Sequence, residues 1–152
     1  MRLELVQNWM TDNPISITTT TTLPEAHAIM KGQDIRRLPV LDAKRHLIGI
    51  ITIGDIRAAE ASPATTLSIW ELNHLLSELK VKNFMTANPI TVTPSTTIGR
   101  AANLMLKHKV SGLPVVNNNS RLVGIITESD IFEMVVLHEW AEMEDYPSMV
   151  VV

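Results

Sequence analysis

The sequence predicts a mixed α/β (α+β) fold made of two β-α-β-β-α units that pack with pseudo-two-fold symmetry. Two observations support this prediction. The chain repeats itself, because residues 6–56 align with residues 81–131 without a gap at an offset of 75, and roughly two in five positions are identical. Within each copy, short apolar runs alternate with segments whose apolar residues recur at helical spacing. Two copies are too few for a solenoid, but they suit a compact pair.

Each copy begins with a short strand and a helix. Alternating apolar residues predict strands at 15–18 and 90–93. A threonine-rich loop follows in each copy and ends in a helix N-cap. The next segment is expected to be a helix, because its apolar residues recur at intervals of three and four. The residues on this face are Leu23, Ala26, Ile29 and Met30 in the first copy and Ile98, Ala101, Leu104 and Met105 in the second.

Each copy then continues with a hairpin and a second helix. Strands are expected at 38–41 and 113–116, followed by turns at 42–45 and 117–120. The next strand is a strongly apolar run, Leu-Ile-Gly-Ile-Ile-Thr in the first copy and Leu-Val-Gly-Ile-Ile-Thr in the second. A helix is expected after each run.

The repeat also predicts the domain boundaries. We expect a first domain at 1–60, a linker with a helix at 61–80, a second domain at 81–137 and a C-terminal tail at 138–152. Between the units, 60–66 is expected to be a loop and 67–79 a helix that packs against the pair or another subunit. The tail is acidic and ends in an apolar stretch, which we expect to pack against a partner chain or the body of the protein.

Composition narrows the possible partners. The 152 residues are 45% hydrophobic, with a net charge of -3, no basic run and few aromatic residues. These features argue against binding to nucleic acid or to an anionic membrane. No apolar signal region begins the chain and no apolar run approaches the ~20 residues that span a bilayer, so we expect a cytoplasmic protein.

Each copy carries a Thr-x-x-Asp sequence after its last strand, Thr52 to Asp55 and Thr127 to Asp130. A helix that starts there offers free backbone N–H groups, which attract anions such as phosphate. The Asp could accept hydrogen bonds from the two adjacent hydroxyls of a ribose. The alternative is that Thr and Asp only start a helix, because both residue types favour a helix N-terminus.

The sequence offers no catalytic or metal-binding set. The five histidines fall in five different predicted elements, and none has a partner at metal-ligand spacing. The chain has no cysteine, no glycine-rich phosphate loop and no Ser-His-Asp order. We therefore expect neither a metal site nor an enzyme.

Three motifs in a fixed order carry a resemblance to a known family. Met-Thr-x-Asn-Pro-Ile, Leu-Pro-Val and Gly-Ile-Ile-Thr-x-x-Asp-Ile occur in this order in both copies. The chain thereby resembles a tandem pair of cystathionine β-synthase (CBS) domains, called a Bateman module, over about residues 6–136. The resemblance implies two three-stranded sheets packed face to face, with two clefts between the units. It also implies regulatory binding of AMP, ADP, ATP or S-adenosylmethionine, and dimerisation into a disc.

The resemblance further implies which residues line each cleft. The preferred site would take Thr52, Gly54, Asp55, Arg36, Met85, Asn88, Ile90, Val110, Ser111 and Gly112. The second site would take Thr127, Ser129, Asp130, Met10, Asn13, Ile15, Ile35, Arg36 and Arg37.

The two implied sites are not equivalent. Gly112 leaves room for a base beside the backbone in the preferred site, and Arg36 suits a phosphate. Arg37 replaces that glycine in the second site, and Glu128 adds a negative charge. We therefore expect the Thr52/Asp55 site to be the better nucleotide site. The alternative for the Arg36-Arg37 pair is a solvated basic edge.

The sequence thus favours a stand-alone regulatory protein that binds an adenine-containing ligand and signals to an unidentified effector protein. No cofactor is obligatory; the ligand is an adenine nucleotide or S-adenosylmethionine, with Mg²⁺ as an optional companion. A homodimer is implied. The alternative is a structural dimerisation or assembly module without a bound nucleotide. A small enzyme is the weakest hypothesis, because no catalytic set is present.

Overall fold

The computed structural model describes residues 3–61 and 68–141. The first half of the chain contains η1 (Val6–Asn8), β1 (Thr11–Asp12), β2 (Ile17–Thr18), α1 (Leu23–Gln33), β3 (Arg37–Leu41), β4 (Leu47–Thr52) and α2 (Ile53–Ala61). The second half contains α3 (Ile69–Glu78), η2 (Val81–Asn83), β5 (Thr86–Ala87), α4 (Ile98–His108), β6 (Gly112–Val116), β7 (Leu122–Thr127) and α5 (Glu128–Ala141). Apart from β2, which has no counterpart strand in the second copy, the elements of the two copies of the repeat follow one another in the same order.

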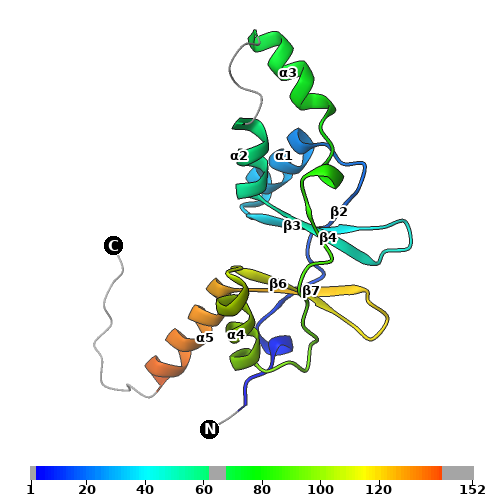
Figure 1. Ribbon diagram of the computed structural model, residues 1–152. Coiled ribbons are helices and arrows are strands. Elements are labelled where there is room, and N and C mark those ends of the chain that lie inside the picture. The colour runs from blue at the N-terminus through cyan, green and yellow to red at the C-terminus, as the bar shows by residue number, and fades with distance from the viewer. Residues whose placement is uncertain (1–2, 62–67, 142–152) are drawn as a thin grey trace.

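Two sheets form the middle of the molecule. One has the strand order β2-β3-β4-β5 and the other β1-β7-β6. Figure 1 shows α1 and α2 on the outer side of the first sheet, and α4 and α5 on the outer side of the second. The inner faces of the two sheets are turned toward each other, which leaves room for sites between them.

The two units exchange their first segments. The β1 strand, from the start of the chain, pairs antiparallel with β7 of the second unit, so that Thr11 lies opposite Ile125. In the same way β5, from the start of the second copy, pairs with β4 of the first unit. Each sheet therefore contains strands from both copies of the repeat.

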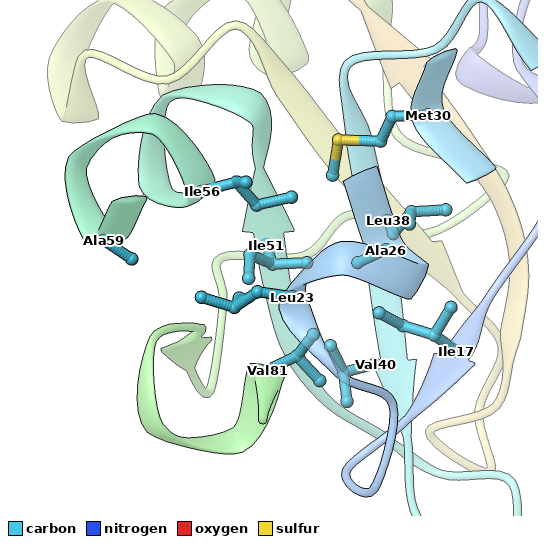
Figure 2. Close-up of a cluster of buried hydrophobic side chains, with 10 residues drawn as sticks. All are labelled: Ile17, Leu23, Ala26, Met30, Leu38, Val40, Ile51, Ile56, Ala59 and Val81. Carbon is cyan, nitrogen blue, oxygen red and sulfur yellow. The ribbon is translucent and has the colours of Figure 1, made fainter. Parts of the chain in front are cut away.

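The hydrophobic cores follow the same exchange. Each core lies between a sheet and its two helices, and Figure 2 shows the first core with Leu38 and Val40 of β3 facing Leu23 of α1. Val81 of η2 is fully buried in this first core, although it belongs to the second copy. Val6 of η1 is equally buried in the second core. Unfolding either unit must therefore expose apolar surface from both copies.

Local sequence explains where the helices before β3 and β6 begin and end. Thr22 caps α1, because its side chain accepts a hydrogen bond from the Glu25 N–H, and the Glu25 carboxylate accepts one from the Thr22 N–H. This reciprocal pair is a capping box. The helix ends at Asp34 in the left-handed region (φ 52°), and Lys109 ends α4 in the same way (φ 54°). These two residues then direct the chain toward the space between the sheets.

The two hairpins meet at their turns. His46 and Arg121 form an antiparallel bridge, and the Leu47 N–H donates to the Ser120 carbonyl at 3.4 Å. Asp42 organises the first turn by accepting hydrogen bonds from backbone N–H groups of Lys44 and His46. Asn117 plays the same part in the second turn.

Several sequence expectations need correction. The strand expected at 15–18 is limited to Ile17–Thr18, and the strand expected at 90–93 is reduced to a single bridge between Val92 and Val115. Pro94 explains the second case, because proline has no N–H with which to continue a ladder. One sheet has four strands rather than three, because β2 adds to it.

The region between the units also differs from expectation. Helix α2 runs through Ala61, so Glu60 and Ala61 are helical rather than part of a loop. The predicted linker helix is present as α3, and in Figure 1 it lies beyond α1 and α2. It has no buried residue, and its Ile69 is 81% exposed. The tail was predicted at 138–152, but residues 138–141 are the end of helix α5 (Glu128–Ala141). The rest of the predicted loop and residues 142–152 of the predicted tail lie outside the described residues.

Among the helices of the described ranges, none combines the length and the apolar character that crossing a membrane requires.

Candidate functional site

Two clefts of similar size are each lined by residues from both copies of the repeat. We call them the Asp55 cleft and the Asp130 cleft after the acidic residue in each. Their volumes, about 550 Å³ and about 540 Å³, fall within the ~300–1,000 Å³ of small-molecule sites. The Asp55 cleft is lined by Arg36, Arg37, Ile50, Thr52, Ile53, Gly54, Asp55, Thr86, Asn88, Pro89, Ile90, Lys109, Val110, Ser111, Gly112, Leu113 and Pro114. The Asp130 cleft is lined by Thr11, Asn13, Pro14, Ile15, Asp34, Ile35, Arg36, Arg37, Pro39, Ser111, Ile125, Thr127, Glu128, Ser129 and Asp130.

The Asp55 side chain is fixed by the residue that starts helix α2. Its Oδ2 accepts hydrogen bonds from the Thr52 N–H (2.8 Å) and the Thr52 Oγ1–H (2.9 Å). The Asp55 N–H donates in turn to Thr52 Oγ1 at 3.2 Å. This is the geometry of a helix cap. These hydrogen bonds show that Thr52 and Asp55 start helix α2, as the alternative drawn from the sequence requires.

The cap leaves two polar groups available to a ligand. Within the described residues, Asp55 Oδ1 makes no hydrogen bond. The Ile53 N–H at the start of α2 donates to the Arg36 carbonyl at 2.8 Å, and the Asp55 N–H is held by Thr52. The Gly54 N–H lies between them and has no intrahelical acceptor, because it belongs to the first helical turn. Both residues line the cleft, so it offers a ligand a carboxylate oxygen and a backbone donor.

The Asp130 cleft repeats this arrangement. Asp130 Oδ2 accepts hydrogen bonds from the Thr127 N–H (2.7 Å) and the Thr127 Oγ1–H (2.9 Å). The Glu128 N–H donates to the Ser111 carbonyl at 3.1 Å. This hydrogen bond is equivalent in the repeat to the one between the Ile53 N–H and the Arg36 carbonyl. The repeat therefore builds the same acidic corner twice, with nearly the same distances.

The charges around the two corners differ. In the Asp55 cleft, Asp55 shares the lining with three cationic residues, Arg36, Arg37 and Lys109. The Asp130 cleft shares the two arginines, but it has carboxylates at Asp34, Glu128 and Asp130. The residue that ends the preceding helix accounts for part of this difference, because it is Lys109 on one side and Asp34 on the other. The Asp55 cleft is therefore the better site for a phosphate.

Arg37 lies in the wall between the clefts. Its Nη2 donates to Ser111 Oγ at 2.7 Å. A Cβ at position 112 would come within 2.9 Å of the Arg37 Cδ, so the arginine side chain occupies space that only a glycine leaves open. Burial lowers the pKa of Arg37, whereas the Glu128 carboxylate raises it; the positive charge of Arg36 lowers it further and Asp130 raises it. Arginine remains charged at neutral pH despite such a shift.

The structure brings together nearly all residues that the sequence predicted for each site. Gly54, Asn88, Ile90, Val110, Ser111 and Gly112 line the Asp55 cleft with Thr52, Asp55 and Arg36. Asn13, Ile15, Ile35, Arg37 and Ser129 line the Asp130 cleft with Thr127 and Asp130.

Two predicted residues, Met85 and Met10, are not among the lining residues of either cleft. The Met85 sulfur lies against Gly49, where a Cβ would overlap it, and Met10 lies against Gly124 in the same way. These methionines pack on the central strands at the places that the glycines leave open. Their side chains are therefore engaged with the sheets rather than turned into the clefts.

Sequence reasoning missed some residues that line the clefts. They include Lys109 and Asp34, whose opposite charges account for part of the charge difference between the two clefts. The two positions are equivalent in the repeat, so a comparison of the copies could have revealed the charge reversal. Apolar residues of the inner strand faces, Ile50 and Ile125, were also missed. Among the described residues, no group of acidic and histidine side chains could hold a metal ion.

The corner of the Asp55 cleft suits a ribose that carries a phosphate. Carboxylate Oδ1 can accept hydrogen bonds from ribose hydroxyls, which are donors. A phosphate can accept from the Gly54 N–H and pair with the cationic side chains. Ile90 and Val110 offer apolar contacts for a flat ring.

Known proteins share this architecture. One is the CBS domain pair of protein MJ0100, which was crystallised in complex with 5′-methylthioadenosine and S-adenosyl-L-methionine. It is 29% identical to this chain, with a TM-score of 0.78, and the match covers 90% of this chain and 99% of that one. CBSX2 in complex with AMP is 25% identical, with a TM-score of 0.75 over 90% of this chain and 98% of that one.

Sequence relatives agree with the structural neighbours. A CBS domain-containing protein of Dictyostelium discoideum is 35% identical over 87% of this chain and 91% of its own length. Other relatives are much longer, and the chain spans 23% of a homoserine O-acetyltransferase from Methanocorpusculum labreanum, to which it is 33% identical. The family model of the CBS domain matches twice, at residues 6–62 and 81–137. The chain therefore belongs to the CBS domain family, as a tandem pair.

Proposed function

We propose that this CBS pair is a regulatory module that binds an adenosine-containing ligand in the Asp55 cleft. The observation that carries the proposal is the composition of that cleft. A carboxylate held by Thr52 leaves one oxygen available beside the Gly54 N–H, and three cationic residues line the same cleft. A helix cap alone does not require the cationic residues.

In the proposed complex, different groups of the cleft bind the ribose, the phosphate and the base. Asp55 Oδ1 would accept hydrogen bonds from the ribose hydroxyls. The Gly54 N–H, Arg36 and Lys109 would hold the phosphate, because cations and free backbone donors both favour it. Ile90 and Val110 would flank the base. Backbone groups would form hydrogen bonds with the edge of the base. AMP contains all three of these components: a base, a ribose and a phosphate.

The structural neighbours support the ligand class. The MJ0100 pair holds 5′-methylthioadenosine and S-adenosyl-L-methionine, and CBSX2 holds AMP; all three compounds contain adenosine. The charges of the Asp55 cleft favour the phosphate-bearing member of this set for that cleft. ADP or ATP, with Mg²⁺ to offset the additional phosphate charge, is the extension of the same proposal.

The proposed role is regulation without turnover. The two sheets contain strands from both copies, so a ligand held between Asp55 of one unit and Ser111 of the other would change how the units sit against each other. A partner protein would read that change. Because several relatives carry the pair within a much longer enzyme, the partner could be a separate effector or a domain of a longer chain.

A thermal-unfolding screen tests the proposal. Wild type would be heated with AMP, ADP, ATP, S-adenosylmethionine or NAD, with and without Mg²⁺. A ligand at a hundred times its dissociation constant adds about 2.7 kcal/mol to the stability of the folded state. For a chain of this size that raises the midpoint by roughly 5–10 °C. A shift with AMP that disappears in Asp55→Ala is expected; no shift with any of these compounds would contradict the proposal.

A second candidate function is assembly without a ligand, and one observation favours it. Helix α5 exposes Phe132 (68%), Val135, Val136 and Leu137. Apolar side chains gathered on one helix mark interaction surfaces. Assembly and ligand binding are compatible, but assembly alone would leave the thermal screen without a shift.

A further inference from the structure

Three residues belong to both clefts at once. Arg36, Arg37 and Ser111 line the Asp55 cleft and the Asp130 cleft. All of the other lining residues belong to one cleft or the other. A wall shared in this way allows the occupant of one cleft to change the chemistry of the other.

Arg37 is the central part of this wall. It reaches across from β3 of the first unit, and its Nη2 donates to Ser111 Oγ of the second unit at 2.7 Å. A Cβ at position 112 would lie 3.0 Å from both Cζ and Nε of the guanidinium. Gly112 and Arg37 are equivalent in the repeat, so this pair of positions contributes one guanidinium where a symmetric pair would contribute two or none. Arg37 is therefore a cation that is available to both clefts, in addition to Arg36.

The charges around Arg37 are unequal before any ligand binds. The carboxylates of Glu128 and Asp130 stabilise its charged form, and both belong only to the Asp130 cleft. On the other side, a phosphate in the Asp55 cleft would be a new anion for the same guanidinium. A guanidinium drawn to that phosphate would neutralise Glu128 and Asp130 less well.

We propose that Arg37 couples the two clefts. A phosphate-bearing ligand in the Asp55 cleft draws the Arg37 guanidinium toward itself and leaves the Asp130 cleft more negative. The Asp130 cleft then binds an adenosyl ligand of net positive charge, such as S-adenosylmethionine, more tightly, and resists a second phosphate-bearing ligand. By linkage, the cationic ligand strengthens binding of the anionic one by the same factor. This inference rests on the proposed function.

Calorimetric titration of S-adenosylmethionine tests the coupling. The full chain would be titrated with and without saturating AMP, and the binding event that Asp130→Ala removes would be followed. We expect AMP to raise the affinity of this event by about fivefold or more, the lower end of typical coupling. Arg37→Met keeps an unbranched side chain but removes the guanidinium and its charge. In this variant, the factor by which AMP raises the S-adenosylmethionine affinity should fall to about one.

Two further variants sharpen the test. Gly112→Ala should also reduce the factor, because its Cβ displaces the Arg37 guanidinium without removing it, and it keeps the test decisive if Arg37→Met unfolds. Arg57→Met removes an exposed arginine of α2 outside both linings, and it should leave the factor unchanged.

The outcomes separate this inference from the proposed function. If AMP binds wild type but leaves the S-adenosylmethionine affinity of the Asp130 cleft unchanged or lowers it, the coupling is refuted and the proposed function stands. The same holds if AMP raises that affinity equally in wild type and Arg37→Met. If AMP does not bind wild type at all, both the proposed function and the coupling are refuted.

Discussion

Asp55 starts a helix and lines a cleft at the same time. Its Oδ2 accepts two hydrogen bonds from Thr52, whereas Oδ1 is left for a ligand. The two roles use different oxygens, so they do not compete. Asp130 has the same hydrogen bonds to Thr127 in a cleft of opposite charge balance. The chain therefore contains a matched control for its own site.

The capping role of the two acids predicts equal effects on stability. Asp55→Ala and Asp130→Ala each remove a side chain that accepts from a helix-starting Thr N–H. Each should lower the free energy of unfolding by about 1 kcal/mol, the typical value for loss of a helix cap. Urea denaturation of the two variants measures this. A loss in Asp55→Ala that exceeds the loss in Asp130→Ala by more than about 1 kcal/mol would mean that Asp55 has a structural role beyond its cap.

Asp42 predicts a pH dependence of the stability of the folded state, which its uncharged counterpart Asn117 cannot contribute. The His46 N–H, together with the His46 ring and the Lys44 N–H, holds the pKa of Asp42 below its ordinary value. A depressed pKa in the folded state adds stability above the unfolded-state pKa, and this stability is lost as the pH falls through the folded-state pKa.

The matched variant for this titration is Asp42→Asn, because Asn117 accepts the same kind of backbone hydrogen bonds in the second turn without a charge. Urea unfolding of wild type and variant at a series of acidic pH values should show that the stability of wild type falls more steeply with acid. Parallel curves for the two proteins would contradict the assignment.

At the scale of elements, helix α5 is the least symmetric part of the repeat. It exposes four apolar side chains, whereas the exposed face of its counterpart α2 carries Arg57 and Ala58. The resemblance to tandem CBS pairs already implied a homodimer. We place the proposed interface on α5, because Phe132, Val135, Val136 and Leu137 are all exposed on that helix.

This interface makes a prediction about the mass of the particle in solution. Phe132→Glu should shift the protein from dimer to monomer, because burying a charge without a partner is costly. Light scattering coupled to gel filtration measures the shift. Ile69→Glu, on the exposed face of α3, is the matched control and should stay dimeric. A monomeric Ile69→Glu with a dimeric Phe132→Glu would move the interface to α3.

At the scale of the whole molecule, the exchange of first segments joins the two units. Val6 and Val81 are each fully buried in the core of the opposite unit. The Val6 N–H donates to the Thr96 carbonyl at 2.8 Å, and the Val81 N–H donates to the Thr21 carbonyl at 2.9 Å. Each unit therefore lacks part of its core without the other, and the pair is the smallest complete folding unit.

The exchange predicts cooperative unfolding. Val6→Ala and Val81→Ala should each lower the free energy of unfolding by about 2 kcal/mol, through lost burial and a small cavity. Both variants should unfold in a single transition followed by urea denaturation. Gln7→Ala, an exposed neighbour in η1, should cost far less. Two separate transitions in Val6→Ala would show that the units unfold independently.

The sequence predicted the fold and most of the clefts, because the repeat places equivalent residues at equivalent positions. It did not predict the exchange of segments, since two nearly identical segments do not reveal which unit each one completes. It placed Met10 and Met85 with the cleft residues, although their side chains pack on Gly124 and Gly49. It overlooked Lys109 and Asp34, because a residue that ends a helix in the left-handed region carries no family motif. It also could not show that Arg37 passes over Gly112, which depends on side-chain direction.

The most direct test of the account is a calorimetric titration of AMP into wild type, Asp55→Ala and Asp130→Ala. The two variants lose the same cap and the same charge, so they differ only in the cleft that they alter. We expect Asp55→Ala to abolish the tighter binding of AMP, whereas Asp130→Ala should retain it. Equal AMP affinities in the two variants, or a loss confined to Asp130→Ala, would contradict the assignment of the phosphate-bearing ligand to the Asp55 cleft.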